Sequence, residues 1–253
     1  MAPSVTDILA PDGLIAASLP NYEHRPEQLE MAEAVDHAFT ANNHLLAEAG
    51  TGVGKSFAYL IPALLQAHRE NRRVVISTYT IALQQQLMTK DLPFLAEVLP
   101  FEFSAVLGLG RSNYLCLRRM AFAMKNRQKL FGHDRLLSEL TEIGEWAMES
   151  ETGCREELDF DVSLTVWEKV CSNGSLCQHA KCPFHARCFL QASRQRLLAA
   201  DIMVVNHAMF FSDLALKQEF AGILGDYDLA VLDEGHTIEQ VASDHFGASL
   251  SSG

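Results

Sequence analysis

The sequence lacks any run of about 18 or more apolar residues, so it contains no candidate transmembrane helix. Its first residues, M-A-P-S-V-T-D, lack the basic and apolar regions of a signal peptide. Tryptophan and tyrosine are scarce, with two and five residues, but 14 phenylalanines and a hydrophobic content of 48% exclude a disordered chain. We therefore expect a folded cytoplasmic protein without a membrane partner.

Positive charge is also in short supply. The 253 residues contain 20 Lys and Arg against 32 Asp and Glu, a formal net charge of −12, which opposes nucleic-acid binding by the chain as a whole. The deficit is uneven: residues 111–135 hold seven bases and one acid, residues 162–200 five bases and one acid, and residues 136–161 nine acids and one base. The two basic segments allow a negatively charged partner to bind locally, although solvated helix faces show the same pattern.

Internal repeats and low-complexity tracts are absent, and apolar runs alternate instead with helical patterns. Strands are predicted at 44–48, 74–77, 104–107, 202–205 and 229–232, and helices at 25–39, 55–69 and 81–90. This alternation indicates an α/β fold with a doubly wound parallel sheet. Residues 110–189 break the pattern, since they are helical, charge-segregated and contain all six cysteines. We interpret them as an insertion between residues 1–109 and 190–253.

A phosphate-binding loop stands between the first predicted strand and the helix after it. It reads A-G-T-G-V-G-K-S, the P-loop pattern with Ala in place of the first Gly. Its glycines let backbone N–H groups turn toward phosphate oxygens, and the start of the helix adds its dipole. Lys55 is expected to bind the β- and γ-phosphates of ATP, and Ser56 to ligate Mg²⁺. The predicted loop residues are Ala49, Gly50, Thr51, Gly52, Val53, Gly54, Lys55 and Ser56.

Two carboxylates follow the last predicted strand, in the sequence L-A-V-L-D-E-G-H. The carboxyl end of a buried strand is where ligands bind in sheets of this kind. Asp233 is expected to hold Mg²⁺, and Glu234 to polarise the attacking water. A strand that ends in Asp-Glu is weak evidence alone, but together with the P-loop it indicates a nucleotide-hydrolysing site.

The order of these two motifs resembles that of superfamily 2 helicases of the D-E-A-H type, with Gly235 in place of Ala. By this resemblance, His236 couples ATP hydrolysis to strand movement. Tyr22, Arg25 and Gln28 match the spacing of the motif that reads adenine in such enzymes. The Gln28 amide offers both a donor and an acceptor to a base edge, although an exposed helix residue is the simpler interpretation of that Gln alone.

The six cysteines form the second signal. Cys177, Cys182 and Cys188 follow the pattern C-x4-C-x5-C, which is wider than the paired knuckles of structural zinc sites. Such spacing, together with one distant Cys, suits a 4Fe–4S cluster held by four thiolates. The bases Lys181, Arg187 and Arg111 favour thiolates. The nearby histidines His179 and His185 leave a zinc site open as an alternative. Unligated thiols are a further alternative.

The segment G-R-S-N-Y-L-C at 110–116 resembles the start of the iron–sulfur segment in the DinG/YoaA branch of XPD-like helicases. By this resemblance the cluster ligands are Cys116, Cys177, Cys182 and Cys188, and neither Cys154 nor Cys171 is a ligand. The V-V-N-H sequence at 204–207 also looks like a strand end of that family. The resemblance extends from residue 11 to residue 247.

The resemblance implies an ATP-dependent DNA helicase that moves 5′→3′ on single-stranded or forked DNA in repair or replication, at the bacterial nucleoid and with replication or repair proteins as partners. Residues 1–109 and 190–253 would form the first RecA-like motor domain, and residues 110–189 the cluster insertion. The motifs that follow D-E-G-H in that family, and its second motor domain, are not in the sequence. We therefore expect little ATP turnover by this chain alone.

DNA contacts are expected at several positions, each with a structural alternative. Thr78 and Thr80 match a phosphate-contacting motif but equally suit a strand-end cap. Basic residues of the insertion would guide the strand, or would form a solvated helix face, and two aromatic residues would stack on bases, or would belong to the core. These residues are Arg111, Arg118, Arg119, Tyr114 and Phe189.

Two other functions remain open. One is a P-loop ATPase or nucleotide switch with a zinc-stabilised insertion and no role on DNA. The other is a non-catalytic, truncated helicase that binds nucleic acid. Metal content separates the first from the helicase interpretation, and ATP turnover separates the second.

Overall fold

The computed structural model describes residues 2–19, 21–50, 52–218 and 222–246. It divides the chain into two compact units. The sheet unit consists of Met1–Gly108 and Leu197–Gly253, and the cysteine unit of Leu109–Arg196. Within the described ranges, no helix is both long enough and apolar enough to cross a bilayer.

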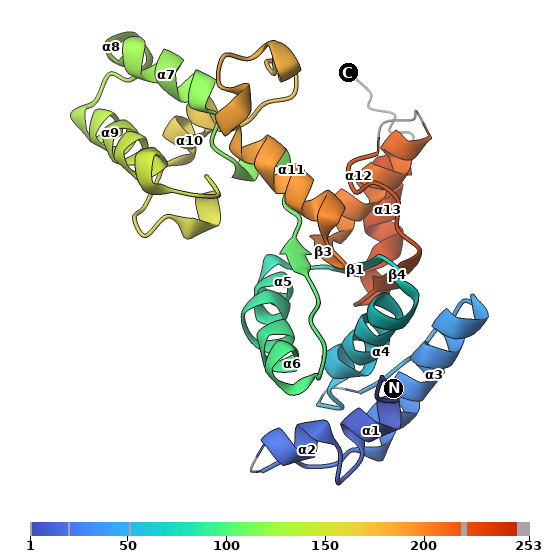
Figure 1. The fold of residues 1–253 in the computed structure, drawn as a ribbon. Helices are drawn as coiled ribbons and strands as arrows, with labels where there is room; N and C mark the ends of the chain where they lie inside the picture. The colour runs from blue at the N-terminus through green and yellow to red at the C-terminus, as the bar shows by residue number, and fades with distance from the viewer. Residues whose placement is uncertain (1, 20, 51, 219–221, 247–253) are drawn as a thin grey trace. The chain divides into compact units, whose positions relative to one another are not determined.

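The elements are drawn in Figure 1. In chain order they are α1 (Val5–Leu9), α2 (Leu14–Ser18), α3 (Pro26–Ala41), α4 (Lys55–Glu70), β1 (Val74–Thr78), α5 (Ile81–Gln86), α6 (Leu92–Val98), β2 (Ala105–Leu107), α7 (Leu117–Lys125), α8 (Arg127–Leu130), α9 (Asp134–Glu149), α10 (Leu164–Val170), α11 (Phe189–Ala199), β3 (Ile202–Asn206), α12 (His207–Lys217), β4 (Leu229–Leu232) and α13 (Ile238–Phe246).

The sheet unit is built on four parallel strands in the order β2-β3-β1-β4. Val74 of β1 pairs with Ile202 of β3 on one side and with Leu229 of β4 on the other. Each strand is a short apolar run, which suits a strand covered on both faces. The predicted α/β fold with a parallel sheet is thus confirmed.

Alternate residues of the strands enter two separate cores, because successive side chains point to opposite faces. Val74 and Ile76 pack with α3, α4 and α6 on one face. Val75 packs on the other face with residues of α12, and α13 contributes partly buried side chains there (Figure 1). The sheet is therefore covered by helices on both faces, which is the doubly wound arrangement.

The strand predicted at 44–48 does not form. Helix α3 ends at Asn42, which adopts a left-handed conformation with φ of 52°, and residues 43–50 then run without regular structure. Leu46 is 97% exposed and Leu45 is 45% exposed, so the apolar run gains no burial. The segment pairs with no described strand, so neither ladder hydrogen bonds nor burial stabilises a strand there. As a result, β4 remains at an edge of the sheet.

The helix predicted at 81–90 extends further than expected. A single π-helical turn, Leu87–Asp91, follows α5 and leads directly into α6. Pro93 lies in the first turn of α6, where its missing N–H does least harm. A widened turn before proline lets the helical path continue to Val98 where a regular α-helix would be interrupted.

The cysteine unit has a hydrophobic core of its own. Residues of α7, α9 and α10 pack around the buried Trp167 and Phe131. Two isolated antiparallel bridges, Tyr114 with Cys154 and Leu115 with Cys171, tie the segment before α7 to the loops around α10. The predicted insertion, 110–189, lies within this unit.

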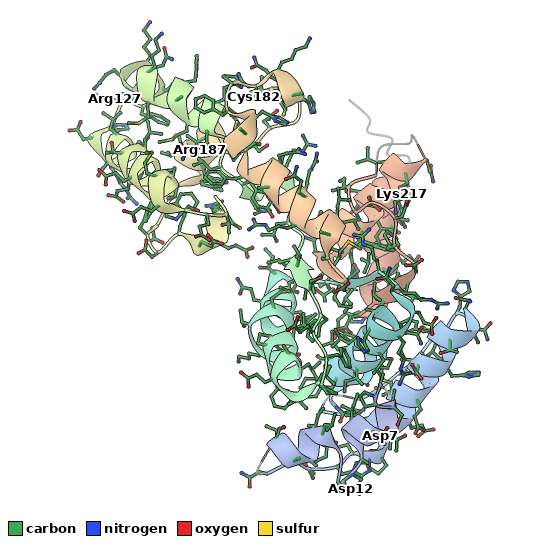
Figure 2. All side chains as sticks on the ribbon, in the orientation of Figure 1. Asp7, Asp12, Arg127, Cys182, Arg187 and Lys217 are labelled. Carbon is green, nitrogen blue, oxygen red and sulfur yellow. The ribbon has the colours of Figure 1, made fainter. Side chains whose placement is uncertain are left out.

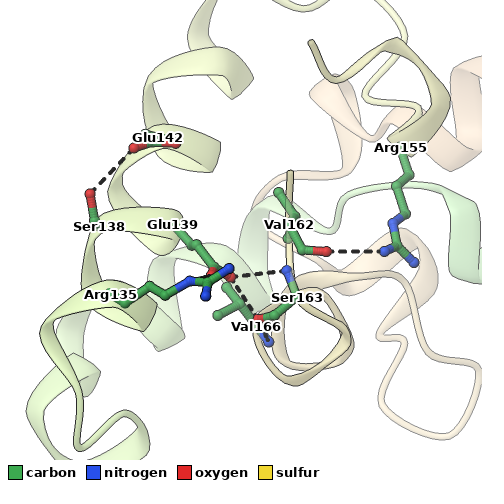
Figure 3. A network of polar contacts seen from close by, with 8 residues as sticks. All are labelled: Arg135, Ser138, Glu139, Glu142, Arg155, Val162, Ser163 and Val166. Carbon is green, nitrogen blue, oxygen red and sulfur yellow. Dashed lines mark hydrogen bonds and ion pairs between the residues drawn. The ribbon is translucent and has the colours of Figure 1, made fainter. Parts of the chain in front are cut away.

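The acidic stretch of the cysteine unit does not form a wholly solvated face. Glu139 on α9 is 6% exposed and accepts hydrogen bonds from the Ser163 backbone N–H at 2.9 Å and the Ser163 hydroxyl at 2.6 Å (Figure 3). Arg135, one turn earlier on α9, approaches the same carboxylate at 3.2 Å. Because Ser163 also caps α10, Glu139 joins α9 to the start of α10.

Candidate nucleotide site and cysteine cavity

The glycine loop leads into α4 through two residues with left-handed backbone. Gly52 has φ of 86° and Gly54 has φ of 85°, conformations that L-residues with side chains rarely adopt. A Cβ atom on Gly54 would lie 2.0 Å from the Gln28 side-chain nitrogen, so glycine is required there for space as well. Thr51, one of the predicted loop residues, lies outside the described residues.

Two residues of the predicted adenine motif contact this loop directly. The Gln28 side-chain N–H donates to the Gly54 carbonyl at 2.8 Å, and Gln28 is only 5% exposed. The Arg25 guanidinium donates to the Gly52 carbonyl. Both bonds engage carbonyl oxygens, which leaves the loop's N–H groups available for an anion. The reading of adenine by Gln28 and Arg25 stays a prediction.

The carboxylates after β4 lie beside β1, at the carboxyl edge of the sheet. The Asp233 N–H donates to the Ser77 carbonyl at 2.9 Å, which continues the pairing of β4 with β1. The Asp233 carboxylate accepts the Tyr59 hydroxyl at 3.1 Å. Burial raises the pKa of Tyr59 and the negative charge of Asp233 adds to this, so the phenol stays a hydrogen-bond donor.

Glu234 and the loop lysine meet at this edge. The Lys55 Nζ lies 3.6 Å from Glu234 Oε1, and the His236 Nδ1 lies 3.5 Å from Glu234 Oε2. Glu234 has φ of 55° and its backbone N–H donates to the Asp233 carboxylate at 2.9 Å, so a tight turn follows β4 at the two acidic residues. The structure thus brings together four predicted residues, Lys55, Asp233, Glu234 and His236.

Ser56 lies next to a carboxylate that the sequence did not single out. Burial raises the pKa of Asp91, and hydrogen bonds with Gln86 and Ser56 oppose that effect. Asp91 belongs to the π-helical turn, and no local pattern in the sequence marks it. Tyr59 was also missed, although its position one helical turn after Lys55 places it on the same side of α4.

His207 is the third residue that the motifs left without a role. It is 1% exposed at the start of α12, and its Nδ1 lies 2.7 Å from the Ser77 hydroxyl. Burial lowers the pKa of His207, whereas the backbone and charge of Asp233 oppose the shift. Its Nε2 is buried without a hydrogen-bond partner among the described residues.

The expected DNA contacts after β1 have structural partners. The Thr80 hydroxyl accepts the Leu83 N–H at 3.2 Å and so caps α5. Thr78 is buried and its hydroxyl donates to the Thr80 carbonyl at 3.3 Å. Contact of either residue with a DNA phosphate stays a prediction.

In the cysteine unit, an open cavity is lined by four of the six cysteines. Cys182 and Arg187 lie in the segment between α10 and α11 (Figure 2), and Arg187 does not line the cavity. Cys154 and Cys171 are buried at the two antiparallel bridges instead, and all six cysteines are free of disulfides. The four cysteines of the cavity are Cys116, Cys177, Cys182 and Cys188.

The cavity also contains candidate ligands for zinc, since His179 and His185 belong to its lining. Among the described residues, however, no three His, Cys, Asp or Glu side chains are placed so that they hold a metal ion. The cavity therefore gathers the predicted ligands without arranging them as a coordination shell.

The aromatic residues expected to stack on bases belong to the core. Tyr114 is 4% exposed and its hydroxyl accepts from Ser193 at 2.7 Å. Phe189 is 8% exposed and covers Gly153, where a Cβ atom would lie 2.2 Å from the ring. The prediction that these two residues stack on bases is therefore wrong, because packing within the unit already covers both rings.

Sequence comparisons agree with the motifs. The profile of the family described as "DEAD/DEAH box helicase" matches residues 25–129. The chain is 36% identical over 260 residues to ATP-dependent DNA helicase YoaA of Escherichia coli K12, covering 98% of this chain and 38% of that protein. It is 34% identical over 265 residues to ATP-dependent helicase DinG of Mycobacterium tuberculosis H37Rv, covering 98% of this chain and 39% of that protein.

A third relative is named as an exonuclease and not as a helicase. The chain is 31% identical over 230 residues to 3′-5′ exonuclease DinG of Bacillus subtilis, covering 90% of this chain and 24% of that protein. The chain thus spans less than two fifths of the length of these curated relatives. Residues 25–129 thus contain a DEAD/DEAH box helicase domain, and the chain is similar over nearly its whole length to YoaA and DinG helicases.

Proposed function

We propose that the sheet unit binds and hydrolyses ATP with Mg²⁺, as the first motor domain of a DNA helicase. The main support for this proposal is that Glu234 contacts both Lys55, at the end of the glycine loop, and Asp233, at the end of β4. Positive charge, two carboxylates and the backbone N–H groups of a glycine loop are the groups that phosphoryl transfer requires. ATP and Mg²⁺, when bound, supply the reacting phosphate and the charge that neutralises it.

Each residue has a defined role in this proposal. The loop N–H groups and Lys55 bind phosphate oxygens, and the Lys55 side chain moves from Glu234 to the phosphate. Glu234, once released from Lys55, orients a water molecule and accepts its proton. Ser56 and Asp233 hold the metal ion, and Tyr59 fixes the orientation of the Asp233 carboxylate through its hydroxyl. Gln28 and Arg25 contact the base and keep the loop in shape, and His236 couples hydrolysis to movement.

We further propose that the cysteine cavity holds a 4Fe–4S cluster on Cys116, Cys177, Cys182 and Cys188. The support is that these four thiols, and neither of the other two, line one cavity. Four thiolates are the ligand set of such a cluster. A cluster would supply a rigid link between chain segments far apart in sequence. Zinc is the second candidate, because His179 and His185 line the same cavity.

DNA is the proposed substrate of the whole enzyme, with 5′→3′ movement along a single strand. Similarity to YoaA, an ATP-dependent DNA helicase, supports DNA as the substrate, whereas the polarity is a proposal from family resemblance alone. Residues 1–109 and 190–253 would form the motor domain and residues 110–189 the insertion. The basic residues Arg111, Arg118 and Arg119 are the proposed strand contacts.

The nucleotide proposal is tested by titrating a fluorescent ATP analogue and Mg²⁺ into the 253-residue chain. We expect Lys55→Ala to weaken binding at least about 10-fold, which corresponds to about 1.4 kcal/mol. Lys129→Ala is the control, since Lys129 is an exposed lysine on α8 of the cysteine unit, and it should bind like the wild type. Equal affinity of Lys55→Ala and the wild type would refute the proposed site.

A further inference from the structure

The cysteine cavity has an unbalanced charge. Four arginines line it, and its lining contains no Asp or Glu. Such a wall repels cations and attracts an anionic group. The arginines are Arg111, Arg118, Arg119 and Arg194.

Two of these arginines use their donors on the protein itself. Arg118 donates to the Leu176 carbonyl, and Arg119 donates to the carbonyls of Cys171 and Glu168. These bonds attach the two side chains to α10 and to the loop that follows it, so part of their donor capacity is used on the protein.

Arg194 is in a different situation. Its Nε is buried and has no hydrogen-bond partner among the described residues. No ion pair joins Arg194 or Arg111 to a carboxylate in the part of the chain that the structure describes. A buried guanidinium donor without a partner is costly, and a second positive charge close by increases the cost.

The local electrostatics agree with this geometry. Burial lowers the pKa of Arg194, and the charge of Arg111 lowers it further. Cys177 and Cys188 act in the opposite direction, and both line the same cavity as Arg194. As thiolates, two of the four proposed cluster ligands would therefore stabilise the Arg194 cation.

Helical spacing directs Arg194 into the cavity. Leu190, Gln191 and Arg194 all belong to its lining, because positions three and four residues before Arg194 share its face of α11. Arg196 is exposed on the same helix and does not line the cavity. Arg194 and Arg196 thus provide two arginines, two residues apart, with only one directed to the cysteines.

We propose that Arg194 donates hydrogen bonds to the sulfur atoms of the cluster held by the four cysteines, and that this raises the cluster's reduction potential and slows its loss. The inference rests on the cluster proposal above. A cluster with four thiolates is anionic, and it gains one further negative charge on accepting an electron. A fixed cation therefore stabilises the reduced form more than the oxidised form. Arg194 is a positioning and tuning residue, since it acts through the cysteine sulfurs.

The test uses the full chain, purified without oxygen, as wild type, Arg194→Met, Arg194→Lys and Arg196→Met. Iron and sulfide content are measured first. Reduction midpoints are then determined by titration with dithionite and redox mediators, monitored by paramagnetic resonance, and iron release to a chelator is timed. We expect a lower midpoint and several-fold faster iron release for Arg194→Met, an intermediate effect for Arg194→Lys, and wild-type values for Arg196→Met.

The outcomes separate the two proposals. Wild-type protein that contains zinc and no iron refutes the cluster itself. Wild-type protein with iron, together with an Arg194→Met variant of unchanged midpoint and unchanged iron release, overturns the role of Arg194 and leaves the cluster standing. An equal shift in Arg196→Met also overturns it, because the effect would then be one of distant charge. If Arg194→Met does not fold, the midpoint of Arg194→Lys decides: a lowered value supports the role and an unchanged value refutes it.

Discussion

At the scale of single residues, His207 connects two parts of the nucleotide site that sequence motifs treat separately. Its ring contacts the Ser77 hydroxyl, and the Ser77 carbonyl accepts the N–H of Asp233. A path of three residues, of which His207 and Ser77 are buried, therefore links the start of α12 to a proposed metal ligand. Since the ring is buried, its neutral form is favoured in the folded protein.

This burial predicts an acid-sensitive contribution to stability. The pKa of His207 is lowered from its ordinary 6.5, so an unfolded chain takes up a proton at that position before the folded chain does. The contribution is fully present above 6.5 and is lost as the pH falls through the folded pKa. We expect His207→Asn, which keeps an amide beside Ser77, to lose less stability than the wild type between about pH 7.5 and about pH 5.5.

Urea unfolding of both proteins at the two pH values measures this difference. His37→Asn is the control, because His37 is exposed on α3 and should retain the wild-type dependence. His207→Asn is also expected to cost about 1–3 kcal/mol at the higher pH, because packing and a hydrogen bond change. Identical pH dependence in all three proteins would contradict the assignment to His207.

At the scale of elements, predictions from the sequence succeeded where the apolar pattern reflects the burial that stabilises the element. The runs that became β1 and β3 are apolar and buried under helices, so pattern and burial agree, whereas β4 is only partly buried. The run at 44–48 has a similar pattern, but forms no strand because no described strand pairs with it. The glycine loop was recognisable because its left-handed conformations require glycine locally.

Partners far apart in sequence could not be predicted in this way. Tyr59 and Asp233 are 174 residues apart, and only the folded sheet brings the phenol to the carboxylate. The four cavity cysteines were predicted as a set from spacing and resemblance, but the unpartnered Arg194 was not, because its environment depends on α11 facing the cavity. Glu139 was missed for the same reason, since an acidic stretch gives no indication that one member is buried.

Glu139 gives a prediction at this scale. Burial raises its pKa, but hydrogen bonds from Ser163 and the charge of Arg135 outweigh burial and hold the pKa below its ordinary 4.5. The carboxylate therefore stabilises the contact between α9 and α10 above 4.5, and this contribution is lost as the pH falls through the folded pKa. We expect Glu139→Gln to reduce the free energy of unfolding by about 1–2 kcal/mol at neutral pH.

Glu142→Gln is the matched control, because Glu142 lies on the same helix, is exposed and contacts only Ser138 in Figure 3. Thermal or urea unfolding should show little change for this variant. The gap between wild type and Glu139→Gln should close in acid. A Glu142→Gln effect as large as that of Glu139→Gln would show that overall charge, and not the Ser163 contact, is responsible.

At the scale of the whole molecule, the chain has separate cores for its two units. The sheet unit is stabilised by the two layers around its strands, and the cysteine unit by the cluster of side chains around Trp167. Both tryptophans of the chain, Trp146 and Trp167, lie in the cysteine unit. Tryptophan fluorescence therefore reports on the cysteine unit alone, whereas nucleotide binding reports on the sheet unit.

This division yields a prediction about the cysteines. Cys182→Ala removes a proposed cluster ligand, so iron should be lost and the fluorescence midpoint in urea should fall, because the loops around the cavity lose their common anchor. Cys154→Ala removes a buried thiol that does not line the cavity, so iron should stay bound while stability falls by about 1 kcal/mol. Binding of the ATP analogue by the sheet unit should be unchanged in both, because Lys55, Asp233 and Glu234 are untouched.

Loss of iron from Cys154→Ala with retention in Cys182→Ala would reverse the ligand assignment. Loss of nucleotide binding in either variant would show that the two units do not fold independently.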